Sequence, residues 1–124
     1  MRGRILLIED NEQNAYLVGY LLGARQWQVI TARDGPTGLR LADTDPPDLI
    51  LLDIQLPGMN GYEVARRLRT RDRLKDTPII AVTSYAMPGD RESCLAAGCT
   101  DYIEKPIDPA TFADQVEGYL GDSK

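Results

Sequence analysis

Residues 49–53, Leu49-Ile50-Leu51-Leu52-Asp53, place a run of four apolar side chains directly before a carboxylate. A short run of leucine and isoleucine bounded by polar residues is typical of a strand that is buried on both faces of a sheet. Strands of this kind belong to α/β proteins, in which helices cover both faces. This segment therefore predicts a central strand with an acidic side chain at its carboxyl end.

Two other apolar runs have the same character, Ile5-Leu6-Leu7-Ile8 and Ile79-Ile80-Ala81-Val82. The segments 27–32 and 101–104 are more polar, which favours places at the edges of the sheet. Helices are expected after the five strands in turn, over residues 11–24, 35–43, 60–69, 88–97 and 108–120. The last helix is expected to use Asp108 as its cap and Pro109 as its first residue.

The alternation of strand and helix, repeated five times, predicts a single α/β domain over residues 1–124. The three most apolar strands belong at the centre of the sheet, and crossovers between parallel strands are right-handed. Together these rules predict a doubly wound, five-stranded parallel sheet with the flavodoxin-like order 2-1-3-4-5. In this order the winding reverses between the first and third strands, which is where such folds bind ligands.

The composition argues against several classes of function. The chain has no histidine, which removes the usual general base, histidine metal sites and Ser-His-Asp catalysis. Its 19 acidic and 14 basic residues give a net charge of −5, which argues against nucleic acid as the main partner. No apolar run approaches the ~20 residues of a membrane span, and residues 1–8 are too short for a secretory signal. A cytoplasmic protein is expected, with Cys94 and Cys99 as reduced, packed thiols.

Polar side chains stand at the ends of four predicted strands. Glu9 and Asp10 follow the first strand, Asp53 ends the third, Thr83 follows the fourth and Lys105 follows the fifth. Because the carboxyl ends of parallel strands share one edge of the sheet, these side chains are expected to converge there. Clustered carboxylates raise one another's pKa unless a cation compensates them, and oxygen ligands without histidine or cysteine favour Mg²⁺. A metal, a lysine and a hydroxyl around a carboxylate suit phosphoryl transfer to that carboxylate.

Four segments together carry a resemblance to a known family. They are Ile8-Glu9-Asp10-Asn11, residues 52–63 (LDIQLPGMNGYE), Ala81-Val82-Thr83-Ser84 and Tyr102-Ile103-Glu104-Lys105-Pro106. From about Arg4 to Leu120 the chain resembles the receiver domain of response regulators, the CheY-like switch proteins of two-component signal transduction. It is similar in particular to single-domain regulators of the DivK kind and to receivers of hybrid sensor kinases.

The resemblance implies that Asp53 accepts a phosphoryl group in a Mg²⁺-dependent reaction. The donor would be a phosphohistidine of a sensor histidine kinase or of a histidine phosphotransfer protein. The metal would be held directly by Asp10, by Asp53 and by the main-chain carbonyl of Gln55, with Glu9 acting through a bound water. The protein would catalyse only its own phosphorylation and dephosphorylation.

The resemblance also assigns the parts of a switch. Lys105 would pair with the phosphoryl oxygens, and the Lys105–Pro106 peptide bond is expected to be cis, as is usual in the family. The Thr83 hydroxyl would move onto the phosphoryl group, and Tyr102 would turn inward as it does so. The fourth helix, fifth strand and fifth helix would then change their surface for a downstream protein partner.

The expected phosphodonor contacts lie near the same edge of the sheet. They are Asn14, Ala15 and Val18 on the first helix, and the turn at Pro106 and Ile107. The unphosphorylated protein is expected to be a monomer, because the fifth helix lacks the basic residues of dimers formed by DNA-binding regulators.

Departures from the commonest pattern of the family are few. Gln55 and Tyr85 lie two residues beyond Asp53 and Thr83, where the family tunes the lifetime of the phosphoryl group. Ser84 replaces the smaller alanine or glycine that often follows the threonine, which tightens access to the site. Neither departure removes the chemistry expected of Asp53.

Three other functions are compatible with parts of the pattern. A hydrolase of the haloacid-dehalogenase kind would need a second aspartate two residues after the nucleophile, where this chain has Gln55. A flavodoxin-like nucleotide-binding protein would need a Ser/Thr/Gly-rich loop after the first strand, where residues 9–12 (EDNE) repel phosphate. The third alternative is a receiver-like module that binds proteins without being phosphorylated.

Overall fold

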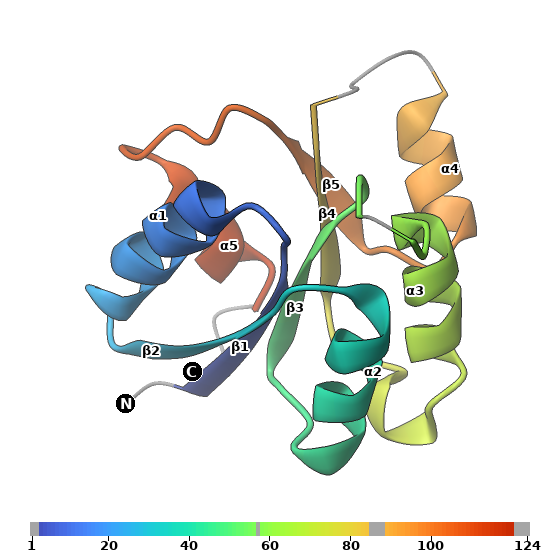
Figure 1. Cartoon of the computed structure of the whole chain (residues 1–124). Helices are drawn as coiled ribbons and strands as arrows, with labels where there is room; N and C mark the ends of the chain where they lie inside the picture. The colour runs from blue at the N-terminus through green and yellow to red at the C-terminus, as the bar shows by residue number, and fades with distance from the viewer. Residues whose placement is uncertain (1–2, 57, 85–88, 121–124) are drawn as a thin grey trace.

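The computed structural model describes residues 3–56, 58–84 and 89–120. Within these residues, five parallel strands form one sheet in the order β2-β1-β3-β4-β5 (Figure 1). The strands are β1 (Gly3–Ile8), β2 (Trp27–Ala32), β3 (Leu49–Asp53), β4 (Ile79–Thr83) and β5 (Asp101–Glu104). The predicted fold class and strand order are therefore confirmed.

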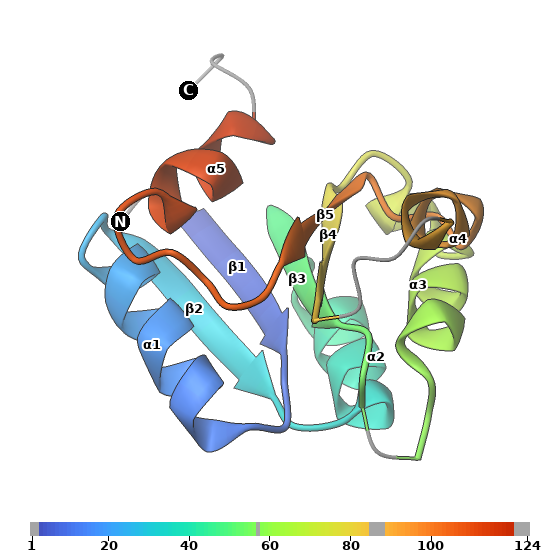
Figure 2. The same ribbon diagram turned by 90° about the horizontal axis from the view of Figure 1, so that it is seen from above.

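Helices cover both faces of this sheet, with α1 and α5 on one face and α2, α3 and α4 on the other (Figure 2). Their bounds are α1 (Glu12–Gly23), α2 (Gly35–Thr44), α3 (Gly61–Arg69), α4 (Asp90–Ala96) and α5 (Phe112–Gly118). A short 3₁₀ helix that the sequence pattern does not predict, η1 (Asp72–Leu74), follows α3. The arrangement is the doubly wound one, with the sheet between two helical layers.

The core has two halves, one on each face of the sheet. Along β1, Ile5 and Leu7 pack in the half under α1 and α5, whereas Leu6 and Ile8 pack in the half under α2, α3 and α4. Every residue of β3 and β4 is buried. These strands therefore have the apolar runs that burial on both faces requires, and their last residues stand at the edge of the core.

The last helix begins later than the sequence predicts. The predicted start of the fifth helix at Pro109 is wrong, because α5 begins at Phe112 and ends at Gly118. The Asp108 side chain accepts a hydrogen bond from the N–H of Ala110 at 3.0 Å, two residues on, which forms a turn before the helix. The expected start of the fourth helix at Pro88 lies outside the described residues.

Side-chain caps start the helices that follow β1 and β3. Asn11 accepts from the N–H of Asn14 at 2.9 Å before α1, and Asn60 accepts from the N–H of Tyr62 at 2.7 Å before α3. Gly61, the first residue of α3, lies so close to the end of β3 that an added Cβ would be 2.5 Å from the Ile54 Cα. The chain is thereby held close to the carboxyl ends of both strands.

Two expectations drawn from composition concern the cysteines and the membrane. Cys94 and Cys99 are free and buried. Burial raises the pKa of Cys99 to about 12 and also raises the pKa of Cys94, so both thiols stay in their neutral, unreactive form. In the part of the chain that the structure describes, no helix has both the length and the apolar character needed to span a bilayer.

Candidate functional site

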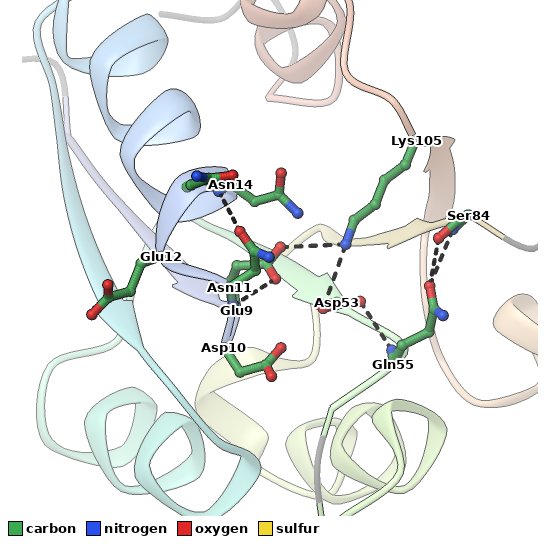
Figure 3. A pocket seen from close by; sticks show the side chains of 10 residues that line it. Glu9, Asp10, Asn11, Glu12, Asn14, Asp53, Gln55, Ser84 and Lys105 are labelled. Atoms are coloured by element: carbon green, nitrogen blue, oxygen red, sulfur yellow. Dashed lines mark hydrogen bonds and ion pairs between the residues drawn. The ribbon is translucent and has the colours of Figure 1, made fainter.

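A pocket of about 550 Å³ opens at the carboxyl edge of the sheet (Figure 3). Residues 9–14 line it from the end of β1 and the first turn of α1, and Asp53 lines it from the end of β3. Gln55, Ser84 and Lys105 complete the lining from the segments after β3, β4 and β5. The pocket therefore collects side chains from four parts of the chain, at the edge where the sequence predicts a ligand.

Three carboxylates meet in this pocket. Each of Glu9, Asp10 and Asp53 offers an oxygen, and these oxygens all lie within 4.8 Å of one another. Glu9 and Asp53 are each only 3% exposed, whereas Asp10 is exposed. A site with two buried carboxylates and one exposed carboxylate is open to solvent on one side only.

Lys105 brings the positive charge to these carboxylates. Its Nζ lies 3.5 Å from Asp53 Oδ2 and 3.6 Å from Glu9 Oε1. The N–H of Lys105 also donates to the carbonyl of Thr83 at 2.8 Å, which ties the end of β5 to the end of β4. The peptide bond to Pro106 is cis, the form expected from the sequence.

The three carboxylates of this pocket carry more negative charge than the single ammonium group of Lys105 can balance. Burial, together with the adjacent Asp53 carboxylate, raises the pKa of Glu9 to about 7, although Lys105 and the N–H of Asn11 act in the opposite direction. One ammonium group therefore does not fully compensate the carboxylates around it.

The donor set fits a hard divalent cation such as Mg²⁺. The clustered ligand atoms are carboxylate oxygens, and the exposed Asp10 leaves room on the solvent side for the waters that Mg²⁺ retains. Gln55 is placed beside them, because its N–H donates to Asp53 Oδ1 at 2.9 Å. A cation bound here would supply the charge that Lys105 alone does not.

The β4 side of the site contains a contact that sequence reasoning missed. Ser84 Oγ lies 2.7 Å from Gln55 Oε1, and the N–H of Ser84 lies 3.3 Å from the same oxygen (Figure 3). Both residues stand out in the sequence as departures from the family pattern near the site, but no sequence pattern shows that their side chains meet. The contact depends on how the segments after β3 and β4 are placed in space.

The two expected switch residues lie on adjacent strands. Thr83 is buried at the end of β4, and Asp53 pairs with its neighbour Val82 across the sheet. Tyr102 in β5 is half-buried against the core under α2, α3 and α4, and it pairs with Ala81. Tyr85, the residue expected to affect the lifetime of the phosphoryl group, lies outside the described residues.

The expectation that Val18 on α1 contacts a partner is wrong, because this side chain does not lie on the surface. Val18 is 2% exposed and packs in the core, so it offers no surface to another protein. Asn14 and Ala15 are half-buried. The large apolar side chains that α1 exposes are Tyr16 and Tyr20, at 76% and 65%. These tyrosines lie two residues before and two residues after Val18, on the opposite side of the helix from the residue that was expected to be exposed.

The remaining expected contacts lie after β5. Pro106 is exposed, whereas Ile107 is half-buried and packs against the core under α1 and α5. The turn therefore presents Pro106 beside the pocket that Lys105 lines.

Comparison with known proteins identifies close relatives of the whole chain. It is 44% identical to the polar-differentiation response regulator DivK of Brucella anthropi over 119 residues, which cover 96% of this chain and 97% of that one. DivK of Brucella ovis is 42% identical over 123 residues, which cover 99% of this chain and all of that one.

Solved structures of receivers share the fold of this chain. The chemotaxis protein CheY4 of Vibrio cholerae superposes with a TM-score of 0.91 at 27% identity, over 96% of this chain and 99% of that one. The receiver domain of the sensor histidine kinase PA1611 of Pseudomonas aeruginosa has a TM-score of 0.88 at 36% identity, over 97% and 98% of the two chains. Its active-site cleft coordinates a magnesium ion. The family model of the response regulator receiver domain matches residues 5–117 of this chain. The chain therefore belongs to the response regulator receiver family, as a DivK-like receiver of two-component signalling.

Proposed function

We propose that this receiver accepts a phosphoryl group on Asp53 from a phosphohistidine of a sensor histidine kinase or a histidine phosphotransfer protein. The observation that carries the proposal is the position of the Asp53 carboxylate. It is buried, with Oδ1 bonded to the N–H of Gln55 at 2.9 Å and Oδ2 3.5 Å from Lys105 Nζ. It also lies beside Glu9 and Asp10 in an open pocket.

This arrangement suits transfer to a carboxylate. An Asp53 oxygen attacks phosphorus as the phosphorus–nitrogen bond of the phosphohistidine breaks, and the imidazole leaves. Bound Mg²⁺ would offset negative charge on the phosphoryl oxygens, held by Asp10, Asp53 and the main-chain carbonyl of Gln55, with Glu9 acting through a water. Lys105 pairs with a phosphoryl oxygen from the other side.

The same phosphoryl group would bias a switch. Phosphorylation adds about −1.5 to −2 of charge and three acceptor oxygens, which attract the Thr83 hydroxyl. Movement of Thr83 at the end of β4 changes the packing space available to Tyr102 in β5. The downstream partner would then bind the surface built by α4, β5 and α5.

Contacts already join the elements of that output surface. Asp101, the first residue of β5, lies 3.5 Å from the guanidinium of Arg91 on α4. It also accepts a hydrogen bond at 3.1 Å from the hydroxyl of Tyr119, which follows α5. A displacement of β5 would therefore act on both neighbouring helices.

The phosphodonor would approach over α1 and the turn after β5. Any protein that reaches Asp53 through the pocket mouth meets the first turn of α1, whose Gln13 and Asn14 line that mouth. Tyr16 and Tyr20 lie further along the same helix, and they offer exposed aromatic surface for the partner. We place Asn14, Ala15, Pro106 and Ile107 at the edge of this interface rather than at its centre, since several of them are half-buried.

A labelling experiment tests the proposal. Incubation with a small phosphodonor and Mg²⁺ is expected to give one base-labile covalent phosphoryl adduct, and Asp53→Asn is expected to abolish it. Asp72→Asn is the matched control, because Asp72 is an exposed carboxylate in η1. An Asp53→Asn protein that is labelled as well as the wild type would show that Asp53 is not the acceptor.

Labelling that fails in the wild type would favour the receiver-like binding module instead. Omission of Mg²⁺ separates the metal requirement from the choice of acceptor. Full labelling in the presence of a chelator would contradict the role of the metal while leaving Asp53 as the acceptor.

A further inference from the structure

Gln55 contacts both walls of the pocket. Its main-chain N–H donates to Asp53 Oδ1 at 2.9 Å. Its side-chain Oε1 accepts from Ser84 Oγ at 2.7 Å and from the N–H of Ser84 at 3.3 Å (Figure 3). One residue therefore joins the carboxylate of β3 to the first residue after β4.

Both polar donors of Ser84 are directed at this one amide oxygen. Ser84 lines the same pocket as Asp53 and directly follows Thr83 at the end of β4. A phosphoryl group on Asp53 would bring three charged acceptor oxygens into that pocket. Hydrogen bonds to charged acceptors are stronger than those to a neutral amide, so the Ser84 donors would gain by leaving Gln55.

We propose that the contact between Gln55 and Ser84 is a clasp of the unphosphorylated state, which opens when Asp53 carries a phosphoryl group. The proposal rests on the proposed function of Asp53. Gln55 is then a positioning residue, because its side chain acts on Ser84 and through it on the end of β4. The clasp opposes phosphorylation, since its hydrogen bonds are lost as the new ones form.

A simple brace between two loops would have a different effect. A brace stabilises the phosphorylated and unphosphorylated states equally, so its removal lowers stability without changing the affinity for a phosphoryl group. A clasp stabilises only the unphosphorylated state, so its removal increases that affinity. The affinity for a phosphoryl analogue therefore separates the two roles.

The experiment measures beryllofluoride binding to the full chain at saturating Mg²⁺. In Gln55→Met, the side chain keeps its length but loses the acceptor, and binding is expected to tighten by roughly two- to tenfold, the range of one or two modest hydrogen bonds. Gln28→Met is the matched control, because it makes the same substitution at an exposed residue of β2 that is not among the residues lining the pocket. Its affinity for beryllofluoride is expected to equal that of the wild type.

Ser84→Ala supplies a second, independent test. In the wild-type background it removes one bond of the clasp and one donor to beryllofluoride, so the two effects partly cancel. In the Gln55→Met background only the second loss remains, so Ser84→Ala is expected to weaken binding more there. Equal effects in the two backgrounds would contradict the proposal.

Amide hydrogen exchange at Ser84 tests the contact itself without any phosphoryl analogue. Exchange is expected to be faster in Gln55→Met than in the wild type and unchanged in Gln28→Met. Unchanged exchange in Gln55→Met, or beryllofluoride binding that is equal or weaker, would overturn the clasp. If Gln55→Met does not fold, Gln55→Ala takes its place. Absence of beryllofluoride binding in the wild type, with Ser84 exchange altered as expected, would instead count against the proposed function of Asp53.

Discussion

The ammonium group of Lys105 lies 3.5 Å from Asp53 Oδ2, and the same nitrogen lies 3.6 Å from Glu9 Oε1. A single cation therefore serves two buried carboxylates from different strands. Burial, together with the adjacent Asp53 carboxylate, raises the pKa of Glu9 despite this ammonium group, and the site is therefore expected to respond to pH and to metal.

Glu9 is expected to make stability depend on pH. Its pKa is about 7 in the folded chain and near the ordinary value of 4.5 when unfolded. Between these values the folded state binds a proton that the unfolded state does not, so the free energy of unfolding falls as pH rises. Without divalent cations, urea denaturation is expected to show a loss on the order of 2 kcal/mol between about pH 5 and pH 7.5.

Glu9→Gln tests the origin of this loss. The neutral amide cannot titrate, so the variant is expected to lack this component of the pH dependence and to exceed the wild type in stability at about pH 7.5. The difference between the two proteins isolates Glu9 from the other titrating groups. If the free energy of unfolding changed with pH in the same way in the wild type and in Glu9→Gln, the pKa of Glu9 would not be raised by folding.

Removal of the lysine charge is expected to separate metal binding from phosphoryl binding. In Lys105→Met, the carboxylates lose their ammonium partner, so Mg²⁺ is expected to bind several-fold more tightly. Labelling by a small phosphodonor is expected to fall by about tenfold or more, because one charged contact to the phosphoryl oxygens is lost. Titration with Mg²⁺ and a labelling time course measure the two effects. A parallel loss of both would mean that Lys105 mainly supports the structure of the site.

Tyr16 and Tyr20, the exposed aromatic side chains of α1, are expected to bind the protein phosphodonor without taking part in phosphoryl transfer itself. Tyr16→Ala and Tyr20→Ala together are expected to slow transfer from a phosphohistidine protein by about tenfold or more, the effect of losing two aromatic contacts. Labelling by a small phosphodonor is expected to stay unchanged, because neither tyrosine lines the pocket. Leu95→Ala is the control, since Leu95 on α4 is the other large apolar side chain that is exposed among the described residues. Equal slowing by Leu95→Ala would indicate a different docking face.

Arg69 is expected to be the most important arginine for stability. Its guanidinium donates to the carbonyls of Gly98, Leu74 and Thr77, each at 2.7 Å, and so joins α3 to the segments before β4 and β5. Arg69→Met removes these three hydrogen bonds to part-buried carbonyls and is expected to lower the free energy of unfolding by about 2–4 kcal/mol in urea denaturation. Arg66→Met, which removes only an exposed ion pair with Glu63, is expected to change stability by less than about 0.5 kcal/mol.

Mg²⁺ affinity serves as the check on that prediction. Arg69 lies away from the pocket lining, so Arg69→Met is expected to leave the affinity of the folded protein unchanged. A loss of Mg²⁺ affinity without a loss of stability would contradict a purely structural role.

The strands and the strand-end residues could be predicted because burial on both faces demands an unbroken apolar run. The apolar runs are residues 5–8, 49–52 and 79–82. A polar residue directly after each run marks the point where the strand leaves the core. Parallel pairing then brings Glu9, Asp53 and Lys105 to one edge, whatever the details of the loops. The prediction of these strands and of their end residues therefore needs only the order of apolar and polar residues along the chain and the general rules of sheet topology.

Other features of the site depend on how distant segments pack against one another. The pKa of Glu9 depends on burial and on its distance from Asp53, and the contact between Gln55 and Ser84 depends on where two loops meet. Apolar residues occur on several sides of α1, so packing against the sheet determined that Val18 faces inward and Tyr16 outward. Local sequence pattern was enough to predict which strand-end residues reach the site, because the strand order follows from it. The three-dimensional arrangement decided how strongly they act on one another, because electrostatic and hydrogen-bond energies depend on distances that no local pattern contains.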